Sequence, residues 1–284
     1  MNKYIGIGGL MKTLGYYNGE YGEIEDMKIP MTDRVCSFGD GVYDVTYARN
    51  HRIFTLDEHM DRFFSSAQLL DIRLPFDKDG MKKLLQDMVD KVDEGSLVIC
   101  WQATRGTQIR CHTYDDNMTA NIWITIRPCE IVDMSQKVDL ITVEDTRFLH
   151  CNIKTLNLIP SVMASQLAMK SGAHEAIFHR GDRVTECAHS NVHIIKNGVL
   201  ITPPPDCYIL KGVARDNLIK ACNALSIPVR VEPFFVQDVF EADEVVITSS
   251  GSLCLQAGKV DGISVGGRAE DIIKRLQAYL LDQF

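Results

Sequence analysis

The stretch Asp145-Thr-Arg-Phe-Leu-His-Cys-Asn-Ile-Lys154-Thr-Leu-Asn-Leu-Ile-Pro160 is centred on one lysine in an otherwise uncharged run. From Cys151 to Met169, Lys154 is the only ionisable side chain apart from the weakly acidic thiol of Cys151. Burial of this segment would desolvate the ammonium group, and desolvated lysines are nucleophilic. Lys154 is therefore a candidate for an imine with a carbonyl compound, although a surface lysine between a strand and a helix fits the same run.

The whole chain has 284 residues, enough for a large core and for two domains. Its content of 45% hydrophobic and 24% charged residues is typical of a globular protein. The formal net charge of −8 leaves no basic stripe to neutralise phosphates, so we expect no nucleic-acid partner. We therefore expect the protein to act on small molecules.

The nine cysteines are scattered and contain no Cys-x-x-Cys pair. They indicate free thiols in a reducing compartment, with neither a disulfide framework nor a metal site. The segment Met1–Leu10 is too broken by glycine for a signal-peptide core, and no apolar run reaches membrane-spanning length. We therefore expect a cytoplasmic protein without a membrane partner, and we interpret Gly6-Ile-Gly8-Gly9 as a flexible arm rather than a dinucleotide loop.

The first half mixes short strands with helices. Asn18-Gly19 is a hairpin signal, and the glycines around Asp40 predict a tight turn before a strand that contains Tyr43. Thr55-Leu-Asp-Glu58 reads as a capping box that opens an amphipathic helix, with Arg62 on its flank. Further segments are a helix at 81–92 and strands at 96–103 and 121–127.

Residues 128–136 break this pattern and form the predicted linker between an amino-terminal domain, 1–127, and a carboxy-terminal domain, 137–284, that carries the lysine. The second domain shows strand signals at 138–143, 175–178, 191–195, 199–201 and 244–248, and helix signals at 160–171, 212–225 and 272–280. Because the elements do not follow strict βαβ alternation, we predict an α+β fold in two domains.

Polar features in the second domain match what pyridoxal phosphate requires. Glu186 lies at a strand-to-turn junction, and a carboxylate beside the pyridine nitrogen would keep that nitrogen protonated. The turn Leu210-Lys-Gly212-Val-Ala-Arg215 opens a helix, and Thr248-Ser-Ser-Gly251 clusters hydroxyls, so both are possible phosphate cradles. Each feature alone also fits an ordinary surface acid, helix start or loop. Their ordered combination with Lys154 favours the cofactor.

A cationic loop precedes the strand at 121–127. Arg105, Arg110 and His112 lie close together in a chain that is acidic overall. If the segment is extended, Arg110 and His112 project from one face, which suits a carboxylate. Solvated loop charge is the alternative.

Several motifs together resemble the fold-type IV pyridoxal-phosphate aminotransferases, and within that class the D-amino-acid (D-alanine) aminotransferases. The likeness runs from about Tyr16 to about Asp261. The motifs are Phe38-Gly-Asp-Gly-Val-Tyr43, Glu58-His-Met-Asp-Arg62, Thr104-Arg-Gly-Thr with Arg110-x-His112, Ile153-Lys-Thr-Leu-Asn157, Val184-Thr-Glu186 with Ser190-Asn191, and Leu210-Lys-Gly212.

The resemblance implies a two-domain α+β fold, pyridoxal 5′-phosphate as cofactor and transamination between D-amino acids and 2-oxo acids. It implies that Lys154 is the Schiff-base lysine and proton carrier, and that Glu186 pairs with the pyridinium. Arg62 would hold the phosphate, with Ser190, Asn191, Leu210, Gly212, Val213, Ala214, Ser249 and Ser250 completing the cofactor site. Tyr43, Arg110 and His112 would trap the substrate α-carboxylate. In the family this loop crosses a dimer interface, so a homodimer is implied.

The chain departs from the family pattern at two places. Ala214 replaces a hydroxyl residue, which costs on the order of 1.5 to 3 kcal/mol if no other donor substitutes. Cys187-Ala-His189 replaces a run of small residues, so His189 either reshapes the substrate pocket or points to solvent. A branched-chain L-amino-acid aminotransferase or an aminodeoxychorismate lyase remains the alternative on the same fold, and a non-catalytic binding protein is the alternative of another class.

Overall fold

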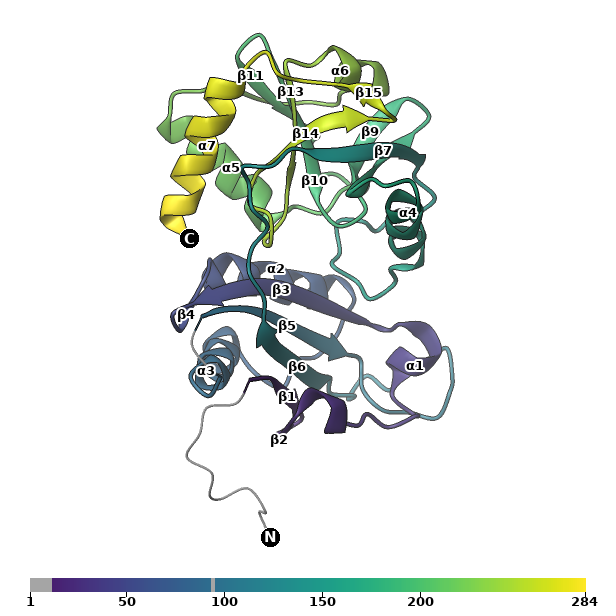
Figure 1. The fold of residues 1–284 in the computed structure, drawn as a ribbon. Coiled ribbons are helices and arrows are strands. Elements are labelled where there is room, and N and C mark those ends of the chain that lie inside the picture. The colour runs from purple at the N-terminus through teal and green to yellow at the C-terminus, as the bar shows by residue number, and fades with distance from the viewer. Residues whose placement is uncertain (1–11, 93–94) are drawn as a thin grey trace. The chain divides into compact units, whose positions relative to one another are not determined.

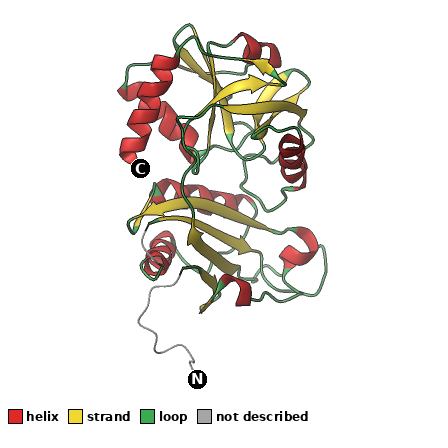
Figure 2. Cartoon of the chain, viewed as in Figure 1, coloured by secondary structure: helices red, strands yellow, loops and turns green. Residues whose placement is uncertain are grey.

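The computed structural model describes residues 12–92 and 95–284, which form two compact units divided between Glu130 and Ile131 (Figure 1). This division falls within the stretch 128–136 that we interpreted as a linker. The predicted arm at residues 6–9 lies outside the described residues. Helices and strands are mixed in both units (Figure 2), so the prediction of an α+β fold is confirmed.

Unit 1, up to Glu130, contains a sheet that is six-stranded in the described residues, in the order β2-β1-β6-β5-β3-β4. All its neighbouring strands are antiparallel. The predicted hairpin is confirmed, because Asn18 and Gly19, at φ of 45° and 98°, join β1 to β2. The strands are β1 Leu14–Tyr17, β2 Glu20–Gly22, β3 Gly41–Arg49, β4 Arg52–Ile53, β5 Ser96–Thr104 and β6 Asn121–Pro128.

The helices of unit 1 are η1 Ile24–Asp26, α1 Arg34–Phe38, α2 Leu56–Leu69 and α3 Lys78–Val89. Helix α2 buries Met60, Phe63 and Ala67 of its apolar stripe, and Phe63 packs edge-on against Trp101 of β5. The predicted capping box is wrong: Thr55 is in the left-handed region, and its buried hydroxyl has no hydrogen-bond partner among the described residues. Helix α1, which was not predicted, ends at Gly39 with φ of 61°.

Unit 2, from Ile131, contains a sheet that is nine-stranded in the described residues, in the order β12-β11-β10-β13-β14-β7-β8-β9, with β15 beside β14. Strand β14 pairs antiparallel with β13 and parallel with β7. It therefore joins β7, β8 and β9, which come earlier in the chain, to the group β10 to β13, which comes later. The strands are β7 Val138–Glu144, β8 Glu175–Arg180, β9 Arg183–Cys187, β10 Asn191–Lys196, β11 Val199–Thr202, β12 Val229–Val231, β13 Glu244–Thr248, β14 Leu255–Val260 and β15 Ile263–Ser264.

The helices of unit 2 are α4 Ile159–Lys170, α5 Val213–Ala224, α6 Val236–Glu241 and α7 Glu270–Gln283. Small residues let α4 approach the sheet closely, since Ala164 and Ala168 pack with Ala176 and Phe178 of β8. Helix α5 begins directly after Gly212, as predicted. In the described part of the chain, none of the helices has the length and apolar character needed to cross a membrane.

Candidate active site

Lys154 lies in the connection between β7 and α4. Its neighbours Ile153 and Thr155 are buried, and the lysine itself is half-buried. The connection is held in place where the Cys151 amide donates to the Cys207 carbonyl at 3.0 Å. The predicted uncharged run thus forms an anchored loop, which limits the positions that the lysine amine can reach.

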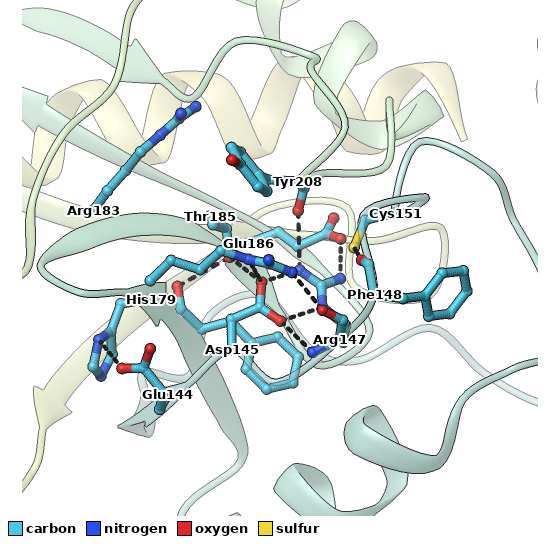
Figure 3. A network of polar contacts seen from close by, with 12 residues as sticks. Glu144, Asp145, Arg147, Phe148, Cys151, His179, Arg183, Thr185, Glu186 and Tyr208 are labelled. Atoms are coloured by element: carbon cyan, nitrogen blue, oxygen red, sulfur yellow. Dashed lines mark hydrogen bonds and ion pairs between the residues drawn. The ribbon is translucent and has the colours of Figure 1, made fainter.

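Glu186 lies near the end of β9 and is almost completely buried. Its Oε1 accepts a hydrogen bond from Arg147 (Figure 3). Its Oε2 accepts from Asn191 Nδ2 and from the Leu210 amide, both at 3.0 Å. A carboxylate offers about four lone-pair sites, so these donors leave room for one more.

Burial raises the pKa of Glu186 to about 7, although the charge and hydrogen bond of Arg147, the Leu210 amide and the charge of Lys154 act in the opposite direction. The charge of Lys154 is therefore one of the influences on this carboxyl. The structure brings together the two residues that the sequence proposed as partners of one cofactor.

Arg147 was not predicted as a site residue. Its guanidinium is held between Glu186 and Asp145, with Nε to Oδ1 and Nη2 to Oδ2 of Asp145 both at 2.9 Å (Figure 3). Asp145 also accepts from Arg180 at 3.1 Å and from Thr185 at 3.1 Å. The spacing Asp145-x-Arg147 just after a strand places two opposite charges on one side of the chain and is the signal that could have revealed the pair.

The start of α5 is the first of the two predicted phosphate cradles. A side chain on Gly212 is excluded, because its Cβ would lie 2.0 Å from Asn191 Oδ1. The side-chain amide of Asn191 also donates, through Nδ2, to the Leu210 carbonyl at 2.9 Å, and this bond fixes the turn. No side chain caps the helix, so its first N–H groups are available to a phosphate. The backbone amides there can donate hydrogen bonds to a phosphate, which the methyl side chain of Ala214 cannot do.

The second predicted cradle, the turn Thr248-Ser-Ser-Gly251, is joined to α5 by a buried polar chain. Arg215 Nε donates to Thr202 Oγ1 at 3.1 Å, and His193 connects Thr202 and Thr248 through its two ring nitrogens at 2.9 Å each. Burial lowers the pKa of His193 to about 3, with the charge of Arg215 acting in the same direction, so its ring is neutral. In the turn itself, Ser249 Oγ lies 2.7 Å from Ser252 Oγ.

Ser190 and His189 lie at the turn between β9 and β10. The Ser190 hydroxyl donates to Glu175 Oε2 at 2.8 Å, and the His189 amide donates to Glu175 Oε1 at 2.6 Å. Glu175 is fully buried, whereas the His189 side chain is 56% exposed. The Ser190 hydroxyl therefore shapes the turn that precedes Asn191, and His189 faces largely outward.

Arg62 belongs to unit 1 and projects from α2 towards β3. Its Nε donates to Asp44 Oδ2 at 2.9 Å, its Nη2 lies 2.5 Å from Oδ1, and His59 Nδ1 lies 2.8 Å from Oδ1. Burial alone would raise the pKa of Asp44, but Arg62 and His59 outweigh it and hold that pKa well below its usual range. The guanidinium is thus oriented by a buried carboxylate, which leaves Nη1 as the end that an anion could bind.

The predicted carboxylate trap also belongs to unit 1. Arg110 and His112 lie in a loop rather than in an extended strand. Both side chains nevertheless lie near Phe38. The Arg110 guanidinium is 5.1 Å from the centre of the Phe38 ring, and the centre of the His112 ring is 5.3 Å from it. Tyr43 is half-buried in β3, and this strand begins at Gly41, shortly after Phe38.

Comparison with known proteins shows the family to which the chain belongs. The family described as amino-transferase class IV matches residues 41–260, and the chain belongs to this family. A D-alanine aminotransferase of Listeria monocytogenes serotype 4b is 36% identical over 274 residues, which cover 94% of each chain. One from Staphylococcus epidermidis is 37% identical over 270 residues, covering 92% of this chain and 94% of the other.

The same fold occurs in a solved structure, the branched-chain amino acid aminotransferase from Escherichia coli. Its TM-score is 0.87 at 24% identity, and the match covers 95% of this chain and 93% of that one. The resemblance to fold-type IV aminotransferases of the D-alanine group is confirmed by these matches.

Proposed function

We propose that this chain catalyses pyridoxal-phosphate-dependent transamination between D-amino acids of the D-alanine and D-glutamate type and 2-oxo acids. The observation that carries the proposal is the buried Glu186 carboxyl, held by Arg147, Asn191 and Leu210 within reach of the Lys154 charge. The similarity to D-alanine aminotransferases along nearly the whole chain supports the choice of substrate.

The residues present fit the cofactor. Glu186 has room for one more donor, such as a pyridinium N–H, and a Cβ at Gly212 would fill the turn that opens α5. When bound, pyridoxal phosphate supplies an electron sink for negative charge that develops at the substrate Cα. The phosphate would be held by Arg62, by the amides of Gly212, Val213 and Ala214, and by Ser249 and Ser250.

Lys154 would carry the cofactor and then move the proton of the substrate. Its Nζ would take the proton from the substrate Cα as a general base and deliver it to the cofactor as a general acid. Glu186 would keep the ring nitrogen protonated, and Tyr43, Arg110 and His112 would hold the α-carboxylate.

A direct assay tests the substrate. Purified enzyme given D-alanine and 2-oxoglutarate should release pyruvate, whereas L-leucine should give no product. Turnover of L-leucine without D-alanine would instead show a branched-chain L-amino-acid aminotransferase. A protein that takes up no pyridoxal phosphate and stays colourless would support a non-catalytic binding role. Borohydride treatment of the yellow enzyme should leave a modified Lys154 peptide.

We also propose that the enzyme is a homodimer in the cytoplasm. Helix α4 shows a face with large exposed apolar side chains, of which Ile159 is 70%, Met163 67% and Leu167 49% exposed. A second copy of the chain would cover such a face, since soluble monomers rarely expose extended apolar patches. All nine cysteines are free thiols, which fits a reducing compartment.

A further inference from the structure

Arg34, in α1, makes contacts that no part of the proposed chemistry uses. It is 4% exposed, and its Nε donates to Asp40 Oδ2 at 2.8 Å. The rest of its guanidinium faces backbone: Nη1 donates to the carbonyls of Cys111 at 2.7 Å and Thr113 at 3.3 Å, and Nη2 donates to the carbonyl of His112 at 3.4 Å. These carbonyls belong to the loop that carries the predicted carboxylate trap.

The aspartate behind Arg34 is itself fixed. Arg105 Nε donates to both oxygens of Asp40, at 3.0 and 2.8 Å, and its two terminal nitrogens donate to the Leu70 and Asp71 carbonyls at 2.8 and 3.0 Å. The Tyr114 ring covers this pair, with its centre 3.8 Å from the Arg105 guanidinium. Arg34 is therefore held on a rigid base that reaches back to the end of α2.

The loop is anchored on either side of Arg110–Thr113, where the Gln108 amide donates to the Thr32 carbonyl at 2.9 Å and the Tyr114 ring packs on Arg105. Residues 108–119 contain no strand or helix, and Ile109 is 82% exposed. A planar guanidinium with its donors in a fixed fork can orient several carbonyls at once, which a flexible ammonium does less well. The main-chain path between Arg110 and Thr113 is thus set largely by one buried side chain. Phe38, on the same short helix, lies 4.8 Å from the Arg34 guanidinium and contacts both trap residues.

We propose that Arg34 is a positioning residue for substrate binding: it holds the loop backbone so that Arg110 and His112 meet the substrate carboxylate. This inference rests on the proposed function of these two residues. Arg34 itself would touch neither the substrate nor the cofactor. Its loss should therefore weaken the capture of amino and 2-oxo acids while the cofactor stays bound.

The test compares holoenzymes carrying Arg34→Gln and Arg34→Lys with the wild type. Arg34→Gln should raise KM for D-alanine by about tenfold to a hundredfold, as expected for a misplaced binding group, with pyridoxal-phosphate affinity unchanged. Trypsin should cut after Arg110 faster in this variant, with no faster cutting elsewhere. Arg34→Lys keeps the charge and should restore part of both losses.

Arg268→Gln is the control, at an arginine that has the same kinds of partners but is 55% exposed. Arg268 also binds one carboxylate, Asp243 at 2.9 Å, and two carbonyls, those of Glu241 at 2.6 Å and Ala242 at 2.7 Å, but it lies in unit 2. It should change neither KM nor the cut after Arg110. Unchanged KM and unchanged cutting in Arg34→Gln would overturn the inference, and so would general loss of cofactor and of protease resistance.

Arg110→Ala separates this inference from the function on which it rests. A rise in KM for D-alanine in Arg110→Ala without one in Arg34→Gln would leave the trap standing and refute the role of Arg34. If Arg110→Ala binds D-alanine normally, the trap itself is refuted, and the inference falls with it even if Arg34→Gln speeds the cut after Arg110.

Discussion

Glu186 is a carboxyl on which opposing influences act. Burial favours its protonated form and raises its pKa to about 7, whereas Arg147, the Leu210 amide and Lys154 favour the charged form. The donors around it fix both oxygens without exhausting their capacity. Such a group is suited to pair with one further N–H that carries positive charge.

Replacing this charge should slow the chemistry. Glu186→Gln keeps the shape but gives a ring nitrogen no anionic partner, so we expect kcat to fall on the order of a hundredfold, comparable to other losses of proton control. Single-turnover measurements with D-alanine check this, because they follow the colour change of the bound cofactor. Equal rates in the variant and the wild type would rule out the pyridinium role. Lys154→Ala should abolish turnover outright.

Residues with local signals could be predicted, and residues with distant partners could not. Lys154, Glu186 and Gly212 stand in short motifs whose chemistry is visible in sequence. Arg34 acts through a contact with the Cys111 carbonyl, 77 positions away, and no local pattern encodes such a contact. Arg147 has a local signal in its spacing from Asp145, but its contact with Glu186 spans 39 positions. The hydrogen bonds from Arg62 to Asp44, 18 positions away, could not be predicted for the same reason.

At the level of elements, His193 connects three neighbouring strands. It lies on β10, and its ring joins Thr202 of β11 to Thr248 of β13. Because the ring is fully buried and neutral, β11 and β13 share a hydrogen-bond chain that excludes water. The chain couples the start of α5, through Arg215, to the Thr248 turn.

The neutral ring makes stability sensitive to acid. The folded state holds the pKa of His193 at about 3, below the ordinary 6.5, so on acidification the unfolded chain takes up a proton that the folded chain refuses. From about pH 6 to pH 4, wild type should lose about 1.4 kcal/mol of unfolding free energy per pH unit more than His193→Phe does. Urea titrations of both proteins across this range measure the difference. Parallel pH profiles would contradict it.

Periodic helices were predictable, whereas α1 was not. Helices α2, α3, α5 and α7 carry apolar stripes at helical spacing, which the sequence shows directly. Helix α1 has five residues, and its one buried side chain is an arginine, so no apolar period announces it. The capping box failed because Thr55 adopts a left-handed conformation, whereas a capping residue normally has an extended backbone.

For the whole molecule, the exposed face of α4 gives the dimer proposal a test. Leu167→Lys should place an unpaired charge in a contact between copies and raise the dimer dissociation constant about tenfold or more. Leu281→Lys on α7 is the control, since the two leucines are 49% and 48% exposed. Sedimentation velocity of the holoenzymes reports the change. Dimers of equal strength in both variants would exclude α4 from the interface.

The position of β14 also governs when unit 2 can finish folding. Strands β7, β8 and β9 are synthesised first and β10 to β13 later, but the two groups are joined in the sheet through β14. Until the ribosome has released Leu255–Val260, β7 and β13 each present an edge with unsatisfied N–H and C=O groups. Unit 1 has all its strands by Pro128 and faces no such delay. The nascent carboxy-terminal half is therefore the part of the chain most exposed to wrong strand pairing.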